Sequence, residues 1–245
     1  MNLVSSETSK KRLLIRVVVL LVLGATAIGY VYARSHYKQT FVRRWLSGYP
    51  SFAWAGPVER PPASERERFT ARLVEAAMER TTHRVLYDAA YVRIPYPGGD
   101  VPADKGVCSD EIVRIYRKVG IDLQQRVHED MAKHFDKYPR LWSQSVEPDS
   151  NIDHRRVPNL MTFFMRHGET LPITKDPKDY LPGDVVCWDL GSGVTHIGMV
   201  VGEKSPDGKR RMIVHNVGAG PMMEDVLFTW KIIAHFRYFG DERAG

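Results

Sequence analysis

The sequence predicts an α+β domain in which helices come first and an antiparallel sheet follows. Apolar residues recur at helical spacing in the first half, through residues 69–78 and 112–119. From residue 180 the pattern changes to short β-type runs, DVVCWD, THIGMVVG and RRMIVHNVG, which are separated by turn residues. A proline-rich stretch at residues 57–62 precedes the first helix. We therefore expect the folded domain to start near residue 63.

The elements are expected in a definite order along the chain. Pro and Gly run through residues 95–106 and predict a loop that leads into a helix from Cys108 to Gly120. Val127, Met131 and Phe135 recur every four residues and predict a second helix over 124–138. After a polar loop, VPNLMTFFMRH is a short helix with proline in its first turn. IIAHFRYF adds a further strand near the end.

Composition and charge exclude several classes of protein. With 43% hydrophobic and 26% charged residues, the chain has the composition of a folded protein. Residues 1–60 hold nine Lys or Arg against two Glu, which exceeds the whole net charge of +6. The remainder is therefore close to neutral, which argues against a nucleic-acid partner. The two cysteines form no C-x-x-C motif, and no H-E-x-x-H motif occurs, so we predict no metal and no organic cofactor.

The N-terminal segment predicts attachment to a membrane. Residues 17–33, VVVLLVLGATAIGYVYA, are uncharged and follow a basic cluster, so we expect a transmembrane helix with the folded domain exported. Residues 1–35 would be a cytoplasmic tip and anchor, residues 36–62 a juxtamembrane linker, and residues 63–240 the domain. A signal peptide cleaved after residue 33, leaving a secreted protein, is the alternative.

Cys108 is the first candidate for chemistry, because it lies where a helix is predicted to begin. Unpaired backbone N–H groups and the helix dipole at that end favour a thiolate. The same N–H groups can stabilise the oxyanion of an acyl-transfer intermediate. The alternative is a structural role, including a disulfide with Cys187 in the DVVCWD run.

Two histidines on the predicted sheet could supply the base that Cys108 needs. His196 starts the HIGMVVG strand and His215 ends MIVHN. A nucleophile, a base and a group that orients the base would complete a Cys-His-His arrangement. The register that would bring the two histidines together is not determined by the sequence. His235, in IIAHFRY, is interpreted as structural.

These residues lie in blocks that resemble a known group of enzymes. GVCSDEI followed by THIGMVV and IVHNVG resembles the NlpC-type branch of the papain-like cysteine peptidases. YPGGDVPADKGVCSD, NIDHRRVPNL, PGDVVCWD, HIGMV and VHNVGAGP are similar, in the same order, to an uncharacterised bacterial domain family of that clan. The resemblance covers residues 84–240. It implies a papain-like NlpC-type fold, with helices packed on a small antiparallel sheet, and a cysteine-hydrolase-like domain at residues 63–240.

The resemblance also implies roles for individual residues. Cys108 would be the nucleophile, His196 the general base and His215 the residue that orients it. Tyr96, twelve positions before Cys108, resembles the tyrosine that many such enzymes place at the oxyanion. Candidate contacts for the oxyanion or the substrate further include the residues that directly follow Cys108 and His215, which are Ser109 and Asn216.

The cluster Asp153-His154-Arg155-Arg156 is a candidate for substrate binding. Arginine forks bind carboxylates, so these side chains could hold the acidic part of a peptide stem. The alternative is an ion-pair network that holds the loop. We expect one arginine to be structural and the other to contact substrate, without assigning which.

The function predicted from these features is that of a membrane-anchored extracytoplasmic cysteine hydrolase, an amidase or peptidase. Its expected partner is a cell-wall peptide or another amide substrate, together with the membrane that holds its N-terminus. Two alternatives remain open: an acyltransferase that uses the same triad, and an anchored module that binds wall peptides with an idle thiol.

Overall fold

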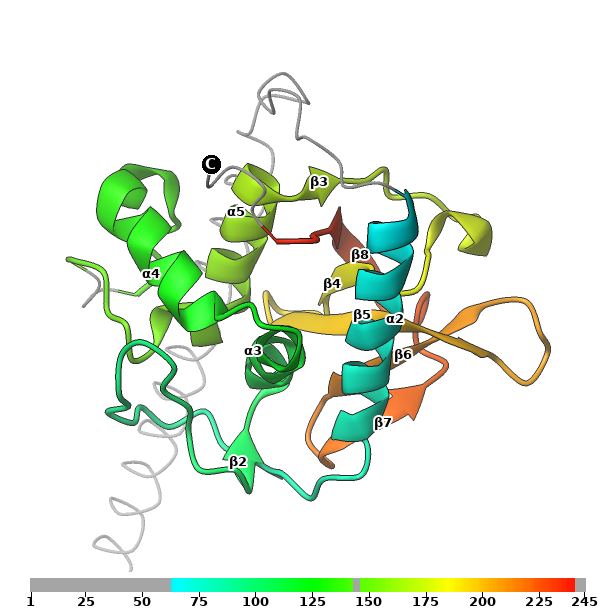
Figure 1. Ribbon diagram of the computed structural model, residues 1–245, viewed down its shortest axis with the longest axis horizontal. Coiled ribbons are helices and arrows are strands. Elements are labelled where there is room, and N and C mark those ends of the chain that lie inside the picture. The colour runs from blue at the N-terminus through cyan, green and yellow to red at the C-terminus, as the bar shows by residue number, and fades with distance from the viewer. Residues whose placement is uncertain (1–62, 143–145, 241–245) are drawn as a thin grey trace, which may run out of the picture. The chain divides into compact units, whose positions relative to one another are not determined.

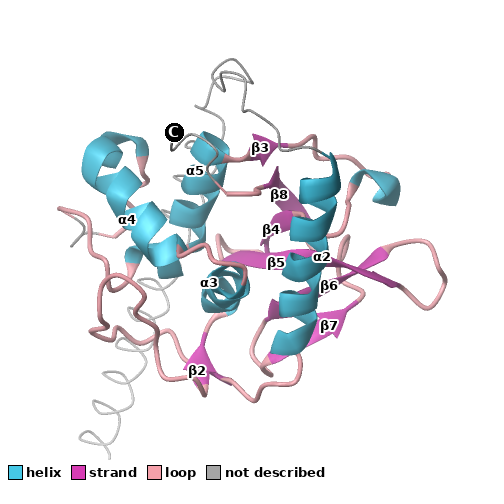
Figure 2. Ribbon diagram, in the orientation of Figure 1, coloured by secondary structure: helices cyan, strands magenta, loops and turns pink. Residues whose placement is uncertain are grey.

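The computed structural model describes residues 63–142 and 146–240 (Figures 1 and 2). The helices are α2 (Ala63–Arg80), α3 (Cys108–Lys118), α4 (Leu123–His134) and α5 (Val157–His167), with short 3-10 turns η1 (Phe135–Lys137), η2 (Asp153–Arg155) and η3 (Pro177–Asp179). The strands are β1 (Leu86–Tyr87), β2 (Lys105–Gly106), β3 (Glu169–Thr170), β4 (Val185–Asp189), β5 (Thr195–Lys204), β6 (Arg211–Asn216), β7 (Pro221–Glu224) and β8 (Lys231–Arg237).

Six strands form one sheet in the order β3-β8-β4-β5-β6-β7, and every neighbouring pair in it is antiparallel. Strands β1 and β2 form a separate parallel pair directly before α3. The mixed architecture, with an antiparallel sheet in the second half of the chain, agrees with the predicted α+β class.

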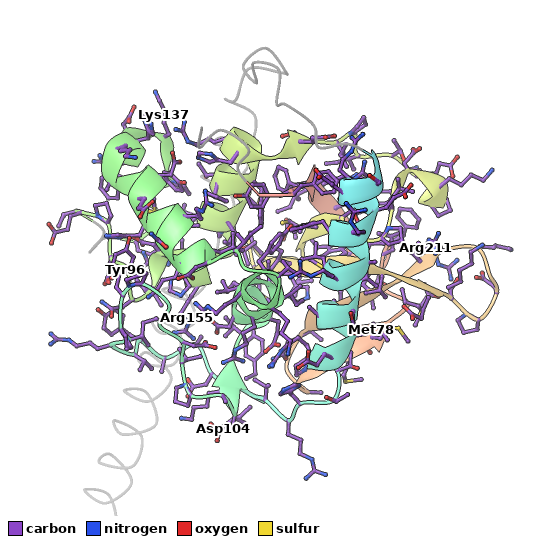
Figure 3. All side chains as sticks on the ribbon, viewed as in Figure 1. Met78, Tyr96, Asp104, Lys137, Arg155 and Arg211 are labelled. Carbon is purple, nitrogen blue, oxygen red and sulfur yellow. The ribbon has the colours of Figure 1, made fainter. Side chains whose placement is uncertain are left out.

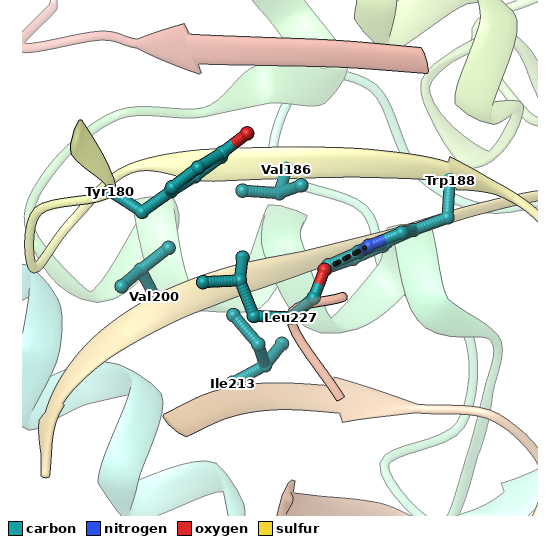
Figure 4. Close-up of a cluster of buried hydrophobic side chains, with 6 residues drawn as sticks. All are labelled: Tyr180, Val186, Trp188, Val200, Ile213 and Leu227. Carbon is teal, nitrogen blue, oxygen red and sulfur yellow. Dashed lines mark hydrogen bonds between the residues drawn. The ribbon is translucent and has the colours of Figure 1, made fainter. Parts of the chain in front are cut away.

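Both faces of the sheet are covered, which explains why β4 is an unbroken apolar run rather than an alternating one. On one face, α2, α3 and α5 contact β5, and Phe236 of β8 packs on Phe164 of α5 with ring centroids 5.9 Å apart. On the other face the Trp188 indole donates a 3.0 Å hydrogen bond to the Leu227 carbonyl, so its one polar atom is paired. That face holds a buried cluster (Figure 4) made of Tyr180, Val186, Trp188, Val200, Ile213 and Leu227.

Helix α3 starts at Cys108 because a side chain in its own first turn, that of Asp110, caps the helix N-terminus. The Asp110 carboxylate accepts a hydrogen bond of 2.7 Å from the Val107 backbone N–H, as an acidic residue in the third helical position commonly does. The inward side chains of α3 are fully buried and hold the helix on the sheet. Gly120 follows the helix with φ of +92°, the left-handed conformation in which glycine ends helices.

Several elements differ from the sequence prediction, among them the two-residue strands β1, β2 and β3, which were not expected. The helix expected over residues 124–138 ends at His134 and continues as η1, none of whose residues is buried. Phe135, the last residue of the predicted stripe, is therefore only partly buried. Strand β7, which extends the sheet beyond the predicted strands, is only four residues long and begins with a proline. A short edge strand of this kind carries little alternating signal.

The predicted fold class also included a transmembrane helix at residues 17–33, and this part of the prediction is corrected. In residues 63–142 and 146–240, no helix is both long enough and apolar enough to cross a bilayer. The longest helix there, α2, has 18 residues and is charged along its length. The apolar run behind the prediction, and the linker at 36–62, lie outside the described residues.

Candidate active site

Two imidazoles on neighbouring strands form the centre of the candidate site. The Nε2 atom of His196 on β5 lies 2.8 Å from the Nδ1 atom of His215 on β6. Both side chains are buried. Trp188 and Trp230 enclose the pair, with ring centroids 5.8 Å from that of His196 in each case. The structure thus brings together the two histidines that the sequence predicts as base and orienting residue.

The register of β5 and β6 explains how the two rings meet. Met199 pairs with Val214 and Val200 with Ile213, but the ladder shifts between Val200 and Lys204. Continuing the pairing by one residue places His215 opposite Gly198, two positions from His196 along β5. A Cβ atom on Gly198 would lie only 3.0 Å from the Cβ of His215. Glycine at this position therefore allows the close approach.

Burial sets the charge state of the pair. Desolvation, and then the neighbouring His215, lower the pKa of His196 to about 3. Desolvation also lowers the pKa of His215, although Glu224 acts in the opposite direction. The Nε2 atom of His215 lies 2.9 Å from a Glu224 carboxylate oxygen on β7, an ion-pair distance rather than a well-aligned hydrogen bond. Both imidazoles are consequently neutral at rest.

The Cys108 thiol lies at the first position of α3, against the strand that carries His196. The backbone of Ile197, the hydroxyl of Tyr87 and the backbone of Ser109 lie beside the sulfur and favour its ionised form. Ile197 directly follows His196, so thiol and imidazole belong to the same end of β5. Within the described residues no hydrogen bond joins the sulfur to His196, so the two groups are not engaged at rest.

The expectation that the helix terminus lowers the pKa of Cys108 is wrong in direction. Burial raises the pKa of this thiol to about 11, because desolvation outweighs the nearby donors. The Cys108 side chain at rest is therefore a neutral thiol. Cys187, fully buried on β4, is also a free thiol whose pKa is raised well above its usual value, first by desolvation and then by Cys108. The disulfide alternative is not what the structure contains.

The tyrosine beside the sulfur is Tyr87, not Tyr96. Desolvation, and then the adjacent Cys108, raise the pKa of the Tyr87 hydroxyl. Tyr96, labelled near α4 in Figure 3, instead packs its ring edge-on against that of His128, with centroids 4.8 Å apart. Sequence reasoning missed Tyr87 because β1 is only two residues long. Its pairing with β2, which leads into Cys108, is not visible as a pattern.

Arg155 is the structural arginine of the pair in the NIDHRRVPNL block. Its guanidinium binds both carboxylate oxygens of Asp110, at 2.8 and 3.0 Å, and donates to the Ala90 carbonyl at 2.8 Å. Ser109 donates its hydroxyl to the Arg155 carbonyl at 2.5 Å. Because Asp110 also caps α3, Arg155 and Ser109 fix the helix end that carries Cys108. Both side chains are buried, so neither is open to contact from outside the domain.

Arg156 lies nearer to solvent than Arg155. It pairs with Asp153 at 3.1 Å, and its guanidinium lies 4.0 Å from the centre of the Trp142 ring. Asp153 is buried, and desolvation raises the pKa of its carboxyl. His154 is also buried; desolvation, followed by Arg155, lowers its pKa to about 4. Arg156 is the most exposed side chain of this cluster.

Asn216 adjoins the histidine pair at the end of β6. Its side-chain oxygen accepts a hydrogen bond from the Gly218 backbone at 3.1 Å, while its buried amide nitrogen has no partner among the described residues.

Glu224, Trp188 and Trp230 complete the surroundings of the pair and were missed from sequence. Trp188 and Glu224 lie in short strands and Trp230 lies directly before β8, and a single aromatic or acidic side chain at such a position carries no signal of its own. In the described part of the chain no three His, Cys, Asp or Glu side chains gather as a metal site requires.

Comparison with known proteins gives the family. The family described as "Domain of unknown function (DUF1287)" matches residues 74–238, which is more than half of the chain. The chain belongs to the DUF1287 family. It is 46% identical over 195 residues to the "Uncharacterized protein YijF" of Escherichia coli (strain K12), a match that covers 79% of this chain and 94% of that protein. The prediction of an uncharacterised bacterial domain family is confirmed, and the DUF1287 match spans every residue of the candidate site.

Proposed function

We infer that this DUF1287 protein is a cysteine hydrolase of the NlpC-type papain-like clan that cleaves amide bonds in cell-wall peptides. The observation that carries the proposal is the 2.8 Å contact between His196 and His215, on the strand against which the Cys108 helix end lies. The order of nucleophile, base and orienting residue along the chain agrees with that clan. A basic cluster followed by an apolar run, before residue 34, supports action outside the cytoplasm.

The proposed reaction starts from two neutral groups. Substrate binding brings the free Nδ1 atom of His196 to the thiol, and the imidazole takes the proton as the sulfur attacks the carbonyl carbon. The backbone N–H groups at the start of α3 and the Tyr87 hydroxyl stabilise the oxyanion. The amine departs with the proton from His196, leaving a thioester on Cys108. Water, deprotonated by His196, then releases the acid and restores the thiol.

Turnover of a defined wall fragment tests this proposal. We expect purified protein to release a new amino group from a stem peptide, detected by mass spectrometry, and Cys108→Ala to abolish it. Cys187→Ala is the matched control, because Cys187 is also a buried free thiol but lies within the sheet. Both variants should lose stability, by about 1 kcal/mol, since each removes a buried sulfur. Equal turnover by Cys108→Ala and wild type would exclude Cys108 as the nucleophile.

One observation favours a second candidate, a module that binds wall peptides with an idle thiol. The Cys108 pKa of about 11 and the His196 pKa of about 3 both oppose a resting thiolate-imidazolium pair. Alkylation by iodoacetamide near neutral pH separates the two candidates. For the hydrolase, we expect a saturating stem peptide to protect Cys108 and His196→Ala to slow labelling in its absence. Labelling as slow as that of an ordinary buried thiol, and unaffected by His196→Ala, would favour the binding module.

A further inference from the structure

Glu224 lies where it can determine which nitrogens of the histidine pair carry protons. In the β6–β7 ladder His215 pairs with Met222 and Ile213 with Glu224, so the carboxylate is the diagonal neighbour of His215 on the same face. A long side chain can span that diagonal, and the Glu224 oxygen reaches 2.9 Å from His215 Nε2. The imidazole is completely buried, whereas the carboxylate side chain is 36% exposed. Among residues 63–142 and 146–240 this nitrogen has no well-aligned hydrogen bond, and the Glu224 carboxylate is the charged group at ion-pair distance from it.

An ionised carboxylate accepts hydrogen bonds and donates none. At 2.9 Å the nitrogen facing Glu224 is favoured in its protonated form, because a lone pair there would face the negative charge, and in a neutral imidazole this leaves the other ring nitrogen as an acceptor. For His215 the acceptor is Nδ1, and the atom 2.8 Å away from it is Nε2 of His196. That nitrogen must then be the protonated one. The remaining nitrogen of His196, Nδ1, is left with a lone pair.

We propose that Glu224 is a positioning residue, which holds His215 in its Nε2-protonated form and thereby keeps the Nδ1 atom of His196 available as the base. The inference rests on the proposed function, because it assigns a role to Glu224 in that reaction. It adds a fourth member to the Cys-His-His arrangement, on a strand that the sequence did not predict.

Nitrogen NMR of histidine-labelled protein reads this arrangement directly and does not depend on activity. In the wild type we expect both His196 and His215 to carry protons on Nε2 and none on Nδ1. In Glu224→Gln the amide can donate as well as accept. We therefore expect signals from a second form of His215 with a protonated Nδ1, and turnover about tenfold lower at unchanged KM.

Glu203→Gln is the matched control, because Glu203 lies on the same sheet and is exposed, and the change removes the same charge. It should leave the histidine signals and turnover as in the wild type, and both variants should keep the wild-type melting temperature. A protonated Nδ1 on His215 in the wild type would overturn the inference. Histidine signals in Glu224→Gln equal to those of Glu203→Gln would do the same, whatever the turnover. Failure of the proposed function has a different signature, namely turnover that survives Cys108→Ala.

Discussion

His196 and His215, nineteen residues apart in the chain, are joined by a 2.8 Å contact between Nε2 and Nδ1, and the rings of Trp188 and Trp230 pack against His196. A buried polar pair of this kind is costly unless each member satisfies the other. The free thiol of Cys108 lies against the backbone of the next residue on the same strand, Ile197, so this pair is our candidate for handling a proton. A core position would be more stable with apolar side chains of similar volume.

Replacing His215 should slow the reaction without abolishing it. In His215→Ala the base remains, but its ring is no longer oriented, so we expect kcat to fall about 100-fold with residual activity. His235→Ala is the matched control, since His235 is equally buried on the same sheet but binds Asp184 at 2.8 Å. It should lower the melting temperature and keep the activity per folded molecule. Equal loss of activity in both variants would assign His215 to the core.

Replacing Gly198 should disturb the pair by crowding. In Gly198→Ala the new methyl group would lie 2.8 Å from an Ile213 side-chain carbon and 3.0 Å from the His215 Cβ. We expect a loss of about 1–3 kcal/mol in the free energy of unfolding, together with lower turnover in the fraction that stays folded. Gly202→Ala lies on the same strand with no atom within 4 Å of the added carbon. Urea unfolding and turnover of the two variants, measured in parallel, separate crowding at His215 from a general effect on β5.

The helices, the main strands and the order of the site residues were predictable because each carries a periodic or terminal signal. Cys108 follows a glycine, precedes acidic residues and starts an apolar stripe, and these features are local. The register of β5 and β6 was not predictable, because it depends on a shift between Val200 and Lys204 that only the folded ladder reveals. The pairing of β5 with β6 in the folded domain therefore decided which histidines meet.

The electrostatics of the site could not be predicted from local pattern. The helix terminus of α3 does favour a thiolate, but the degree to which the fold buries Cys108 is a property of the whole domain, and it raises the pKa instead. Arg155 illustrates the same limit. An arginine in a polar loop suggests a ligand contact, whereas its actual partner, Asp110, lies 45 residues away on α3.

Arg155 and Arg156 should respond differently to truncation. Arg155→Ala leaves the buried Asp110 carboxylate without its guanidinium partner, so we expect a loss of about 3–5 kcal/mol in the free energy of unfolding. Arg156→Ala removes a partly exposed pair with Asp153 and should cost about 1 kcal/mol. If Arg156 contacts substrate, its variant should raise KM with little change in kcat. Equal destabilisation by the two variants would contradict the assignment of Arg155 as the structural residue.

Mild acid should destabilise the domain through its buried histidines. His154 and His196 have folded-state pKa values of about 4 and about 3, below the value of 6.5 that histidine has when unfolded. The unfolded chain therefore binds more protons below about pH 6.5, so stability is fully present above that pH and falls as the pH is lowered toward the folded values. Each histidine should contribute about 1.4 kcal/mol of lost stability per pH unit.

Urea unfolding between about pH 7 and about pH 5 measures this slope, a window that lies above the unfolded pKa of aspartate. His154→Gln should reduce the slope by about 1.4 kcal/mol per pH unit, because one proton fewer is taken up on unfolding. His83→Gln is the matched control, since His83 is exposed at the end of α2, and it should keep the wild-type slope. A His154→Gln slope equal to that of the wild type would show that His154 becomes protonated without unfolding, in which case the buried neutral imidazole is not the source of acid sensitivity.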